Sequence, residues 1–264
     1  MTKSRKRKLL QPNFLIITFA AAFIGIFSTY AAAQTDHVNL EEGLPTSLED
    51  AYPTAYRNRE VQFYTRYEKG RDGTDRVVYN PRFEFGPFRN TQVSVTVPFY
   101  SGSGDRTGSG DVRVEAFYNF NTESRKLPAF AVVGRVTAPS GKDSAGLDTA
   151  VKFIATKSIS NRLDRLHLNL ELERNGGARF DERNTLYRAI LGYSGRIGAD
   201  TLFVADFVRR QERMRGENSN VIEAGIRRQL NPLTVLTFGA GAGIGEQSPR
   251  FQISIGIQRS ITIF

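Results

Sequence analysis

A short stretch at residues 166–173 (LHLNLELE) constrains the fold more than any other part of the chain. Leucine occupies every second position, and His167, Asn169, Glu171 and Glu173 fill the gaps. A β-strand sends alternate side chains to opposite faces, so as a strand this stretch has one leucine face and one polar, ionisable face. In a helix the same leucines would spread around the axis and bury no common surface. The stretch therefore predicts a strand whose polar face meets either bulk water or a water-filled lumen.

The same alternation recurs along the chain after residue 59. We expect twelve strands in all, and the one at 128–138 is weaker because it is apolar on both faces. The others cover residues 61–67, 77–85, 93–99, 112–120, 149–155, 166–172, 187–193, 203–207, 222–226, 234–243 and 251–257. An even number of short alternating segments with polar connections is the sequence signature of a transmembrane β-barrel. The fold predicted is all-β, a single antiparallel up-and-down barrel.

The connections provide a second test, because such barrels have short turns on the periplasmic side and longer loops outside. Counted from a periplasmic start, the expected outer loops are 69–74, 100–109, 139–146, 174–184, 211–219 and 243–249. The expected inner turns are 86–90, 121–126, 158–165, 196–200 and 230–233. Most outer loops are the longer ones and are rich in Gly, Ser, Asp and Arg. Loop 69–74 and turn 158–165 break the trend, and a miscounted register could explain either.

The N-terminus has the three parts of a secretory signal peptide. Five basic residues between positions 3 and 8 precede an apolar run at 14–27, and alanines at 31–33 follow. We expect cleavage near Ala33 and Gln34, since the apolar run is short for an uncleaved membrane anchor. Removal of five basic and no acidic groups lowers the formal charge from +9 to +4. The high positive charge, which was the main argument for a nucleic-acid partner, therefore belongs largely to the signal peptide. The chain has no cysteine, which excludes disulfides and thiolate metal sites.

Between the signal peptide and the first expected strand lies a distinct segment, residues 34–59. It is acidic, contains Pro45 and Pro53, and shows no strand alternation. We interpret it as a periplasmic lead-in or a small plug. The predicted layout is a signal peptide at 1–33, this segment at 34–59, and an outer-membrane β-barrel at 60–264.

A soluble all-β sandwich would also show short alternating strands. The signal peptide, aromatic residues at strand ends and the terminal Phe264 favour the barrel instead. Outer-membrane barrels typically end in an aromatic residue that continues the apolar phase of the last strand. Here Phe264 is out of phase by one residue, and a bulge at Arg259 and Ser260 would restore the phase.

Several short motifs support a family resemblance. They are EGLPT at 42–46, EDAY at 49–52, GSGDVR at 108–113 leading into YNF at 118–120, and APSG at 138–141. In their order and spacing the chain resembles the outer-membrane family described as the MetA pathway of phenol degradation, over most of its mature length. The resemblance implies an outer-membrane barrel linked to uptake of small hydrophobic or aromatic compounds. The identity of the cargo is not carried over.

The polar faces of the expected strands carry acidic and basic residues in similar number. The residues that we expect to line the lumen are Arg66, Arg82, Glu84, Arg113, Glu115, Lys152, His167, Glu171, Glu173, Arg188, Asp206, Arg210, Glu223 and Arg227. They could form a lattice of cross-strand ion pairs that stiffens the wall, each pair contributing about 0.2–1 kcal/mol. They could equally line a polar conduit with weak ion selectivity. A twelve-stranded barrel lies between side-chain-filled eight-stranded barrels and open porins, so the strand number leaves both open.

Other candidate sites are weaker. His37 and His167 are the only histidines, which cannot form a metal cluster, and no serine lies beside His167 on its strand. Gly239, Gly241 and Gly243 alternate along one strand and form a strip of wall without side chains. That strip could admit a plug or substrate close to the backbone, or could bend the strand to close the barrel. We expect no catalytic residues, no metal and no cofactor.

Together these observations predict a passive channel or transporter for small molecules in the outer membrane of a Gram-negative bacterium. The alternative is a non-conducting structural or adhesive barrel that presents its outer loops. The expected partners are outer-membrane lipid, the barrel-assembly machinery and a small-molecule cargo, with no nucleic acid.

Overall fold

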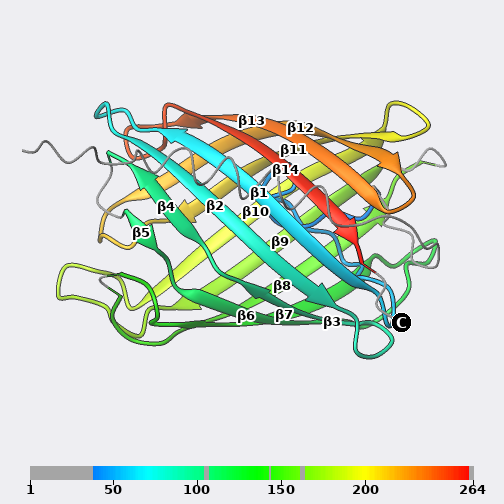
Figure 1. The fold of residues 1–264 in the computed structure, drawn as a ribbon, viewed down its shortest axis with the longest axis horizontal. Coiled ribbons are helices and arrows are strands. Elements are labelled where there is room, and N and C mark those ends of the chain that lie inside the picture. Colours follow the sequence, from blue (N-terminus) through cyan, green and yellow to red (C-terminus); the bar gives the residue numbers. More distant parts are fainter. Residues whose placement is uncertain (1–37, 104–106, 143, 161–163, 262–264) are drawn as a thin grey trace, which may run out of the picture. The chain divides into compact units, whose positions relative to one another are not determined.

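A computed structural model of the protein describes residues 38–103, 107–142, 144–160 and 164–261. The expected signal peptide, His37 and Phe264 lie outside these ranges. The strands form one antiparallel sheet that closes on itself, because β1 pairs with both β2 and β14 (Figure 1). The strand segments are β1 (Arg59–Lys69), β2 (Asp75–Phe85), β3 (Thr91–Thr96), β4 (Phe99–Gly102), β5 (Gly108–Ser109), β6 (Val112–Asn119), β7 (Ala129–Ala138), β8 (Asp148–Ser158), β9 (Arg165–Arg174), β10 (Thr185–Arg196), β11 (Thr201–Gln211), β12 (Asn218–Asn231), β13 (Thr234–Ile244) and β14 (Phe251–Ser260).

In the part of the chain that the structure describes, the closed barrel has twelve wall strands. β3 and β4 both pair with β2 and are one wall strand interrupted at Val97 and Pro98, and β5 and β6 form the interrupted strand beside it. Fourteen segments less these two interruptions leave twelve strands, which confirms the predicted fold. Proline has no N–H to donate to a ladder, so a break at Pro98 follows from its chemistry. The Pro98 carbonyl still accepts a hydrogen bond from the Gly110 N–H at 2.7 Å.

The barrel has an apolar exterior and a polar interior. Leu168 and Leu172 on β9 are 37% and 62% exposed, whereas His167 and Asn169 between them are buried. The exposed leucine, valine, isoleucine and phenylalanine side chains continue around the other strands. A soluble sandwich would bury these apolar faces, and a contiguous exposed apolar band of this extent is a membrane-facing surface. No helix in the described ranges is long and apolar enough to cross a membrane.

The connections follow the predicted sides closely. The ends of the barrel are called here the loop end, with connections 70–74, 103–107, 139–147, 175–184, 212–217 and 245–250, and the turn end, with connections 86–90, 120–128, 159–164, 197–200 and 232–233. The short connection at 70–74 is genuine, since β1 and β2 stay in register from Arg59↔Phe85 to Lys69↔Asp75. The bulge expected at the end of the last strand is absent from the described residues, because β14 pairs with β1 in register up to Ser260.

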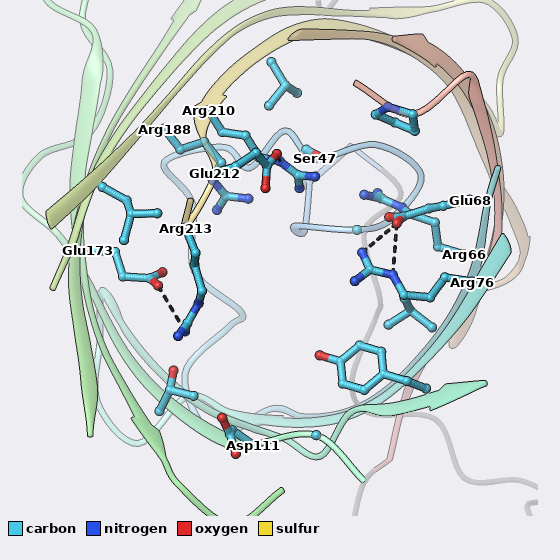
Figure 2. A pocket seen from close by; sticks show the side chains of 18 of the residues that line it. Ser47, Arg66, Glu68, Arg76, Asp111, Glu173, Arg188, Arg210, Glu212 and Arg213 are labelled. Atoms are coloured by element: carbon cyan, nitrogen blue, oxygen red, sulfur yellow. Dashed lines mark hydrogen bonds and ion pairs between the residues drawn. The ribbon is translucent and has the colours of Figure 1, made fainter. Parts of the chain in front are cut away.

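Residues 38–58, called here the N-terminal segment, form no strand and lie against the inner wall. Figure 2 shows this segment as the pale blue loop across the barrel interior. Leu40 and Leu48 form one buried apolar cluster with side chains of β10, β11 and β12. Ala51 joins a second cluster with side chains of β6, β7 and β8. The apolar core of the protein therefore lies between this segment and the barrel wall.

Glycines on the inner wall leave room for the N-terminal segment. A Cβ atom at Gly239 would lie 2.5 Å from the carbonyl oxygen of Pro45, and one at Gly225 would lie 2.8 Å from its ring. A Cβ atom at Gly256 would collide with the side chain of Leu44. Since real Cβ atoms essentially never approach other atoms this closely, a larger residue at these positions would push the segment away from the wall.

Candidate lumen site

A cavity of about 750 Å³ occupies the loop end of the barrel. Its walls come from β1, β2, β4, β6 and β7–β11, and the Glu42, Gly43 and Ser47 positions of the N-terminal segment line its base. Figure 2 shows arginine and carboxylate side chains projecting into it from opposite sides of the wall. The cavity is therefore a water-accessible, highly charged chamber.

Arg135 lines the cavity and is at the centre of an ion-pair network. Its guanidinium lies 2.7 Å from the Glu171 carboxylate, 3.1 Å from that of Glu173 and 3.6 Å from that of Glu115. Arg82 approaches the same Glu115 at 2.9 Å. These contacts link β2, β6, β7 and β9 along the inner wall, so the charged residues form a lattice and not isolated pairs.

Glu42 connects the N-terminal segment to this lattice. One of its carboxylate oxygens accepts a hydrogen bond from Lys152 at 2.6 Å, and the other accepts one from Arg188 at 2.6 Å. Burial alone would raise the pKa of Glu42, but the charges of Arg188, Lys152 and Arg135 outweigh it and hold that pKa well below its usual value. Lys152 also forms an ion pair with Glu49. Two carboxylates of the segment thus neutralise one buried lysine of β8.

Further hydrogen bonds seat the segment along its length. The Ser47 N–H donates to the Glu223 carboxylate at 2.7 Å, and the Glu49 N–H donates to the Asn169 side chain at 3.0 Å. Near the turn end, the Arg227 side chain donates to the Leu44 carbonyl at 2.6 Å. Because the segment has no strand partners, these wall side chains satisfy backbone groups that would otherwise be buried without a partner.

The residues predicted to line the lumen all lie on the inward phase of their strands. Arg82, Glu84, Glu115, Lys152, Glu171, Glu173 and Arg188 share the network around Arg135 and Glu42. Arg66 lies 3.5 Å from Glu223, which is the cross-strand partner of Asp206. Arg210 pairs with Glu212 at 2.7 Å near the rim. Arg113 faces the cavity, and Gly241 and Gly243 continue the inner face of β13 beyond Gly239.

The sequence pattern did not predict two features of the site. Arg135 lies on the strand judged apolar on both faces, and its signal was its place in the inward phase after Ala129, Ala131 and Val133. The contribution of Glu42 and Glu49 carried no periodic signal, because the N-terminal segment makes its contacts through tertiary structure alone.

His167 has a serine neighbour on the adjacent strand. Its Nε2 atom lies 2.9 Å from Ser194 Oγ, and its Nδ1 atom lies 3.0 Å from Thr156 Oγ1. A serine nucleophile needs a base oriented by a third group and an open approach for substrate. Here the third group is a hydroxyl, and His167 and Ser194 are buried, so this arrangement is a hydrogen-bonded part of the wall. In the described ranges, no group of three or more His, Cys, Asp or Glu side chains is arranged to hold a metal ion.

Comparison with solved structures supports the fold. The COG4313 outer membrane channel from Pseudomonas putida F1 matches with a TM-score of 0.65 at 11% identity, over 80% of this chain and 98% of that one. The NanC porin matches with a TM-score of 0.56 at 12% identity, over 77% and 100% of the two chains. The KdgM porin, solved with disordered oligogalacturonate, matches with a TM-score of 0.55 at 10% identity, over 77% and 99%.

At these identities the structural matches establish the fold, that of an outer-membrane β-barrel. No curated protein matches the sequence. A family model does, over residues 58–261, which is most of the chain and includes every strand. Its description is "Putative MetA-pathway of phenol degradation". The chain belongs to this family.

Proposed function

We propose that the protein is a passive outer-membrane channel for small molecules, with aromatic compounds as its cargo. The observation that carries the proposal is the cavity of about 750 Å³ at the loop end, which the wall side chains leave unfilled. A barrel that served only as a scaffold would have no need for a water-accessible chamber lined by converging polar groups. The tyrosines that line it, Tyr64, Tyr100 and Tyr187, offer ring surfaces to an aromatic cargo.

The family description, phenol degradation, agrees with aromatic cargo. Uptake of phenol into liposomes tests this part of the proposal. We expect phenol to enter faster when the protein is present than when it is absent. Equal rates would exclude aromatic transport.

We further propose that the N-terminal segment is a plug that restricts the lumen. Its hydrogen bonds to β8, β9 and β12 and its two apolar contacts with the wall support this role. Planar-bilayer conductance should be compared between the mature protein and a chain lacking residues 34–58. A rise in current on deletion is expected, and an unchanged current would contradict the plug. Heat-shifted gel mobility of both chains checks that each has folded.

A non-conducting adhesive barrel is the second candidate, and the organisation of the loop end favours it. Arg213 forms an ion pair with Asp148, and the Arg183 N–H donates to the Arg213 carbonyl at 2.8 Å. These contacts join the loop-end start of β8 to connections 175–184 and 212–217. Binding of a surface ligand by a protein that shows no bilayer conductance would favour this candidate. In both cases we propose that the protein is not an enzyme and that the barrel-assembly machinery inserts it.

A further inference from the structure

We infer that the cavity at the loop end binds the carboxylate of a small aromatic acid, with Arg113 and Tyr64 as its receptor and Glu42 as an internal competitor. This inference rests on the proposed channel function and names the class of cargo. Among the strand arginines of the cavity wall that the structure describes, Arg113 is the one that the ion-pair lattice leaves unpaired.

Arg113 differs from the other strand arginines that line the cavity. Each of those pairs with a carboxylate: Arg66, Arg76, Arg135, Arg188 and Arg210. Within the part of the chain that the structure describes, Arg113 has neither an ion pair nor a hydrogen bond from its side chain. The reason is its register, because its partners on both neighbouring strands are threonines, Thr96 and Thr137.

The two carboxylates nearest to Arg113 in sequence on the inward phase, those of Asp111 and Glu115, already accept hydrogen bonds from other groups. Glu115 accepts hydrogen bonds from Arg82 and Ser94, and an Asp111 oxygen accepts one from the Gly141 N–H at 2.8 Å. Arg113 therefore presents a fork of N–H donors to the cavity, and none of the described residues accepts from it. A guanidinium of this kind matches the geometry of a carboxylate, which can accept two parallel hydrogen bonds.

Tyr64 supplies a second unpaired donor at the same place. Its hydroxyl has no hydrogen-bond partner in the described ranges, and with Arg113 it lines a small side pocket off the main cavity. The Tyr64 ring packs against the α-carbon of Gly43, and the Tyr100 ring packs against Gly110, three residues before Arg113. A ligand held by Arg113 and the Tyr64 hydroxyl thus meets aromatic rings that favour an aromatic body.

Glu42 competes with such a ligand. Its carboxylate lines both the cavity and the side pocket, and it is held by Lys152 and Arg188. A second carboxylate in this chamber would repel Glu42 and share its cations. Binding of the ligand and seating of the N-terminal segment are therefore opposed, and each weakens the other.

The test uses the full mature protein in liposomes and bilayers at pH 7, where benzoate is ionised and phenol is neutral. Arg113→Gln and Arg210→Gln remove the same charge from the cavity, but only Arg113 is unpaired. Benzoate binding is measured as saturable block of the bilayer current. We expect R113Q to weaken it about tenfold, because that is the effect of losing one charge-assisted hydrogen bond. R210Q should change it less than twofold, and Tyr64→Phe should weaken it about threefold.

Glu42→Gln provides an opposite readout. It should strengthen benzoate block and shift the reversal potential toward anion selectivity, a change that a loss of stability alone does not produce. Equal effects of R113Q and R210Q, or no benzoate block in the wild type, would overturn the inference. Phenol uptake separates the two proposals. If phenol enters while benzoate block is unaffected by R113Q, only the carboxylate site is wrong. If neither conductance nor phenol uptake occurs, the proposed channel function is wrong.

Discussion

At the scale of single residues, the seating of the N-terminal segment depends on groups with little freedom. Gly43 has a φ of +92°, a backbone conformation that residues with a side chain adopt at a cost, and its α-carbon lies against the Tyr64 ring. Asp50 is fully buried and accepts hydrogen bonds from the Leu40 and Tyr52 N–H groups at 3.1 and 3.0 Å. Each residue supports a prediction about how firmly the segment is held against the wall, and so about the proposed plug.

Replacing Gly43 by alanine should raise the channel's conductance. The new Cβ atom would collide with the Tyr64 ring in addition to straining the backbone, so the segment must move. Gly73→Ala is the matched control, because Gly73 has a φ of +90° but nothing within 4 Å of its Cβ position. Planar-bilayer recordings of both variants test the prediction. If G73A raises the current as much as G43A, contact with Tyr64 is not what holds the segment.

The seating of the segment should also depend on pH through Asp50. Burial raises the pKa of Asp50 from its ordinary 3.8 to about 7, against the opposing charge of Arg165 and hydrogen bonds from the Tyr52 and Leu40 N–H groups. The seated segment therefore binds more protons than the released one between these two pH values. The contribution of Asp50 to this seating is complete below pH 3.8, declines as pH rises and is lost above about pH 7.

Conductance should accordingly rise between pH 4 and pH 7 and change little above that range. Asp50→Asn removes the titrating group and should flatten the profile. Asp72→Asn, in an exposed connection at the loop end, should leave it unchanged. An unaltered profile in D50N would show that Asp50 does not control how the segment is seated.

At the scale of elements, each strand has one face toward lipid and one face toward the lumen. β9 shows this most clearly, since its leucines face outward and His167, Asn169 and Glu171 face inward. A single register slip would reverse the two faces, so the alternation specifies the register strongly. β7 obeys the same rule with small side chains at Ala129 and Ala131, where Ala51 of the N-terminal segment packs.

A nitroxide spin label at Leu168 should report contact with lipid. Leu168 lies mid-strand on the outward face, where the barrel wall meets the hydrocarbon. We expect the label to be accessible to oxygen dissolved in the lipid and shielded from a water-soluble relaxation agent. A label at Lys69, at the loop end of β1, is the control and should respond to the water-soluble agent. A Leu168 label packed by protein on all sides would contradict the barrel's placement in a membrane.

At the scale of the whole molecule, the ion-pair lattice makes the wall and the N-terminal segment one unit. Lys152 on β8 neutralises both Glu42 and Glu49, and its side chain is 3% exposed. Breaking a buried pair by removing one partner leaves an uncompensated charge, which costs about 3–5 kcal/mol. Pairs near the surface contribute about 0–1 kcal/mol.

Lys152→Gln should therefore lower the free energy of unfolding by about 3 kcal/mol. Lys157→Gln, on the same strand but paired with Glu123 where both are partly exposed, should lower it by less than about 1 kcal/mol. Denaturant unfolding of both variants in detergent, followed by tyrosine fluorescence and heat-shifted mobility, measures the difference. Adding Glu49→Gln to K152Q should restore part of the loss. Equal destabilisation by the two lysine variants would show that the buried ion pairs contribute no more to the free energy of unfolding than a partly exposed pair.

The sequence by itself determined the number of strands, the face that each presents and the sides on which the connections lie. These properties are local, because period-two alternation assigns each residue to lipid or lumen without reference to its neighbours in space. The tertiary structure alone decided which charges meet: that Arg135 joins three carboxylates, that Ser194 lies beside His167, that Arg113 has only threonines as cross-strand partners, and that residues 38–58 occupy the lumen. Such contacts depend on the register between strands and on a segment without periodicity, and both are set only when the barrel closes.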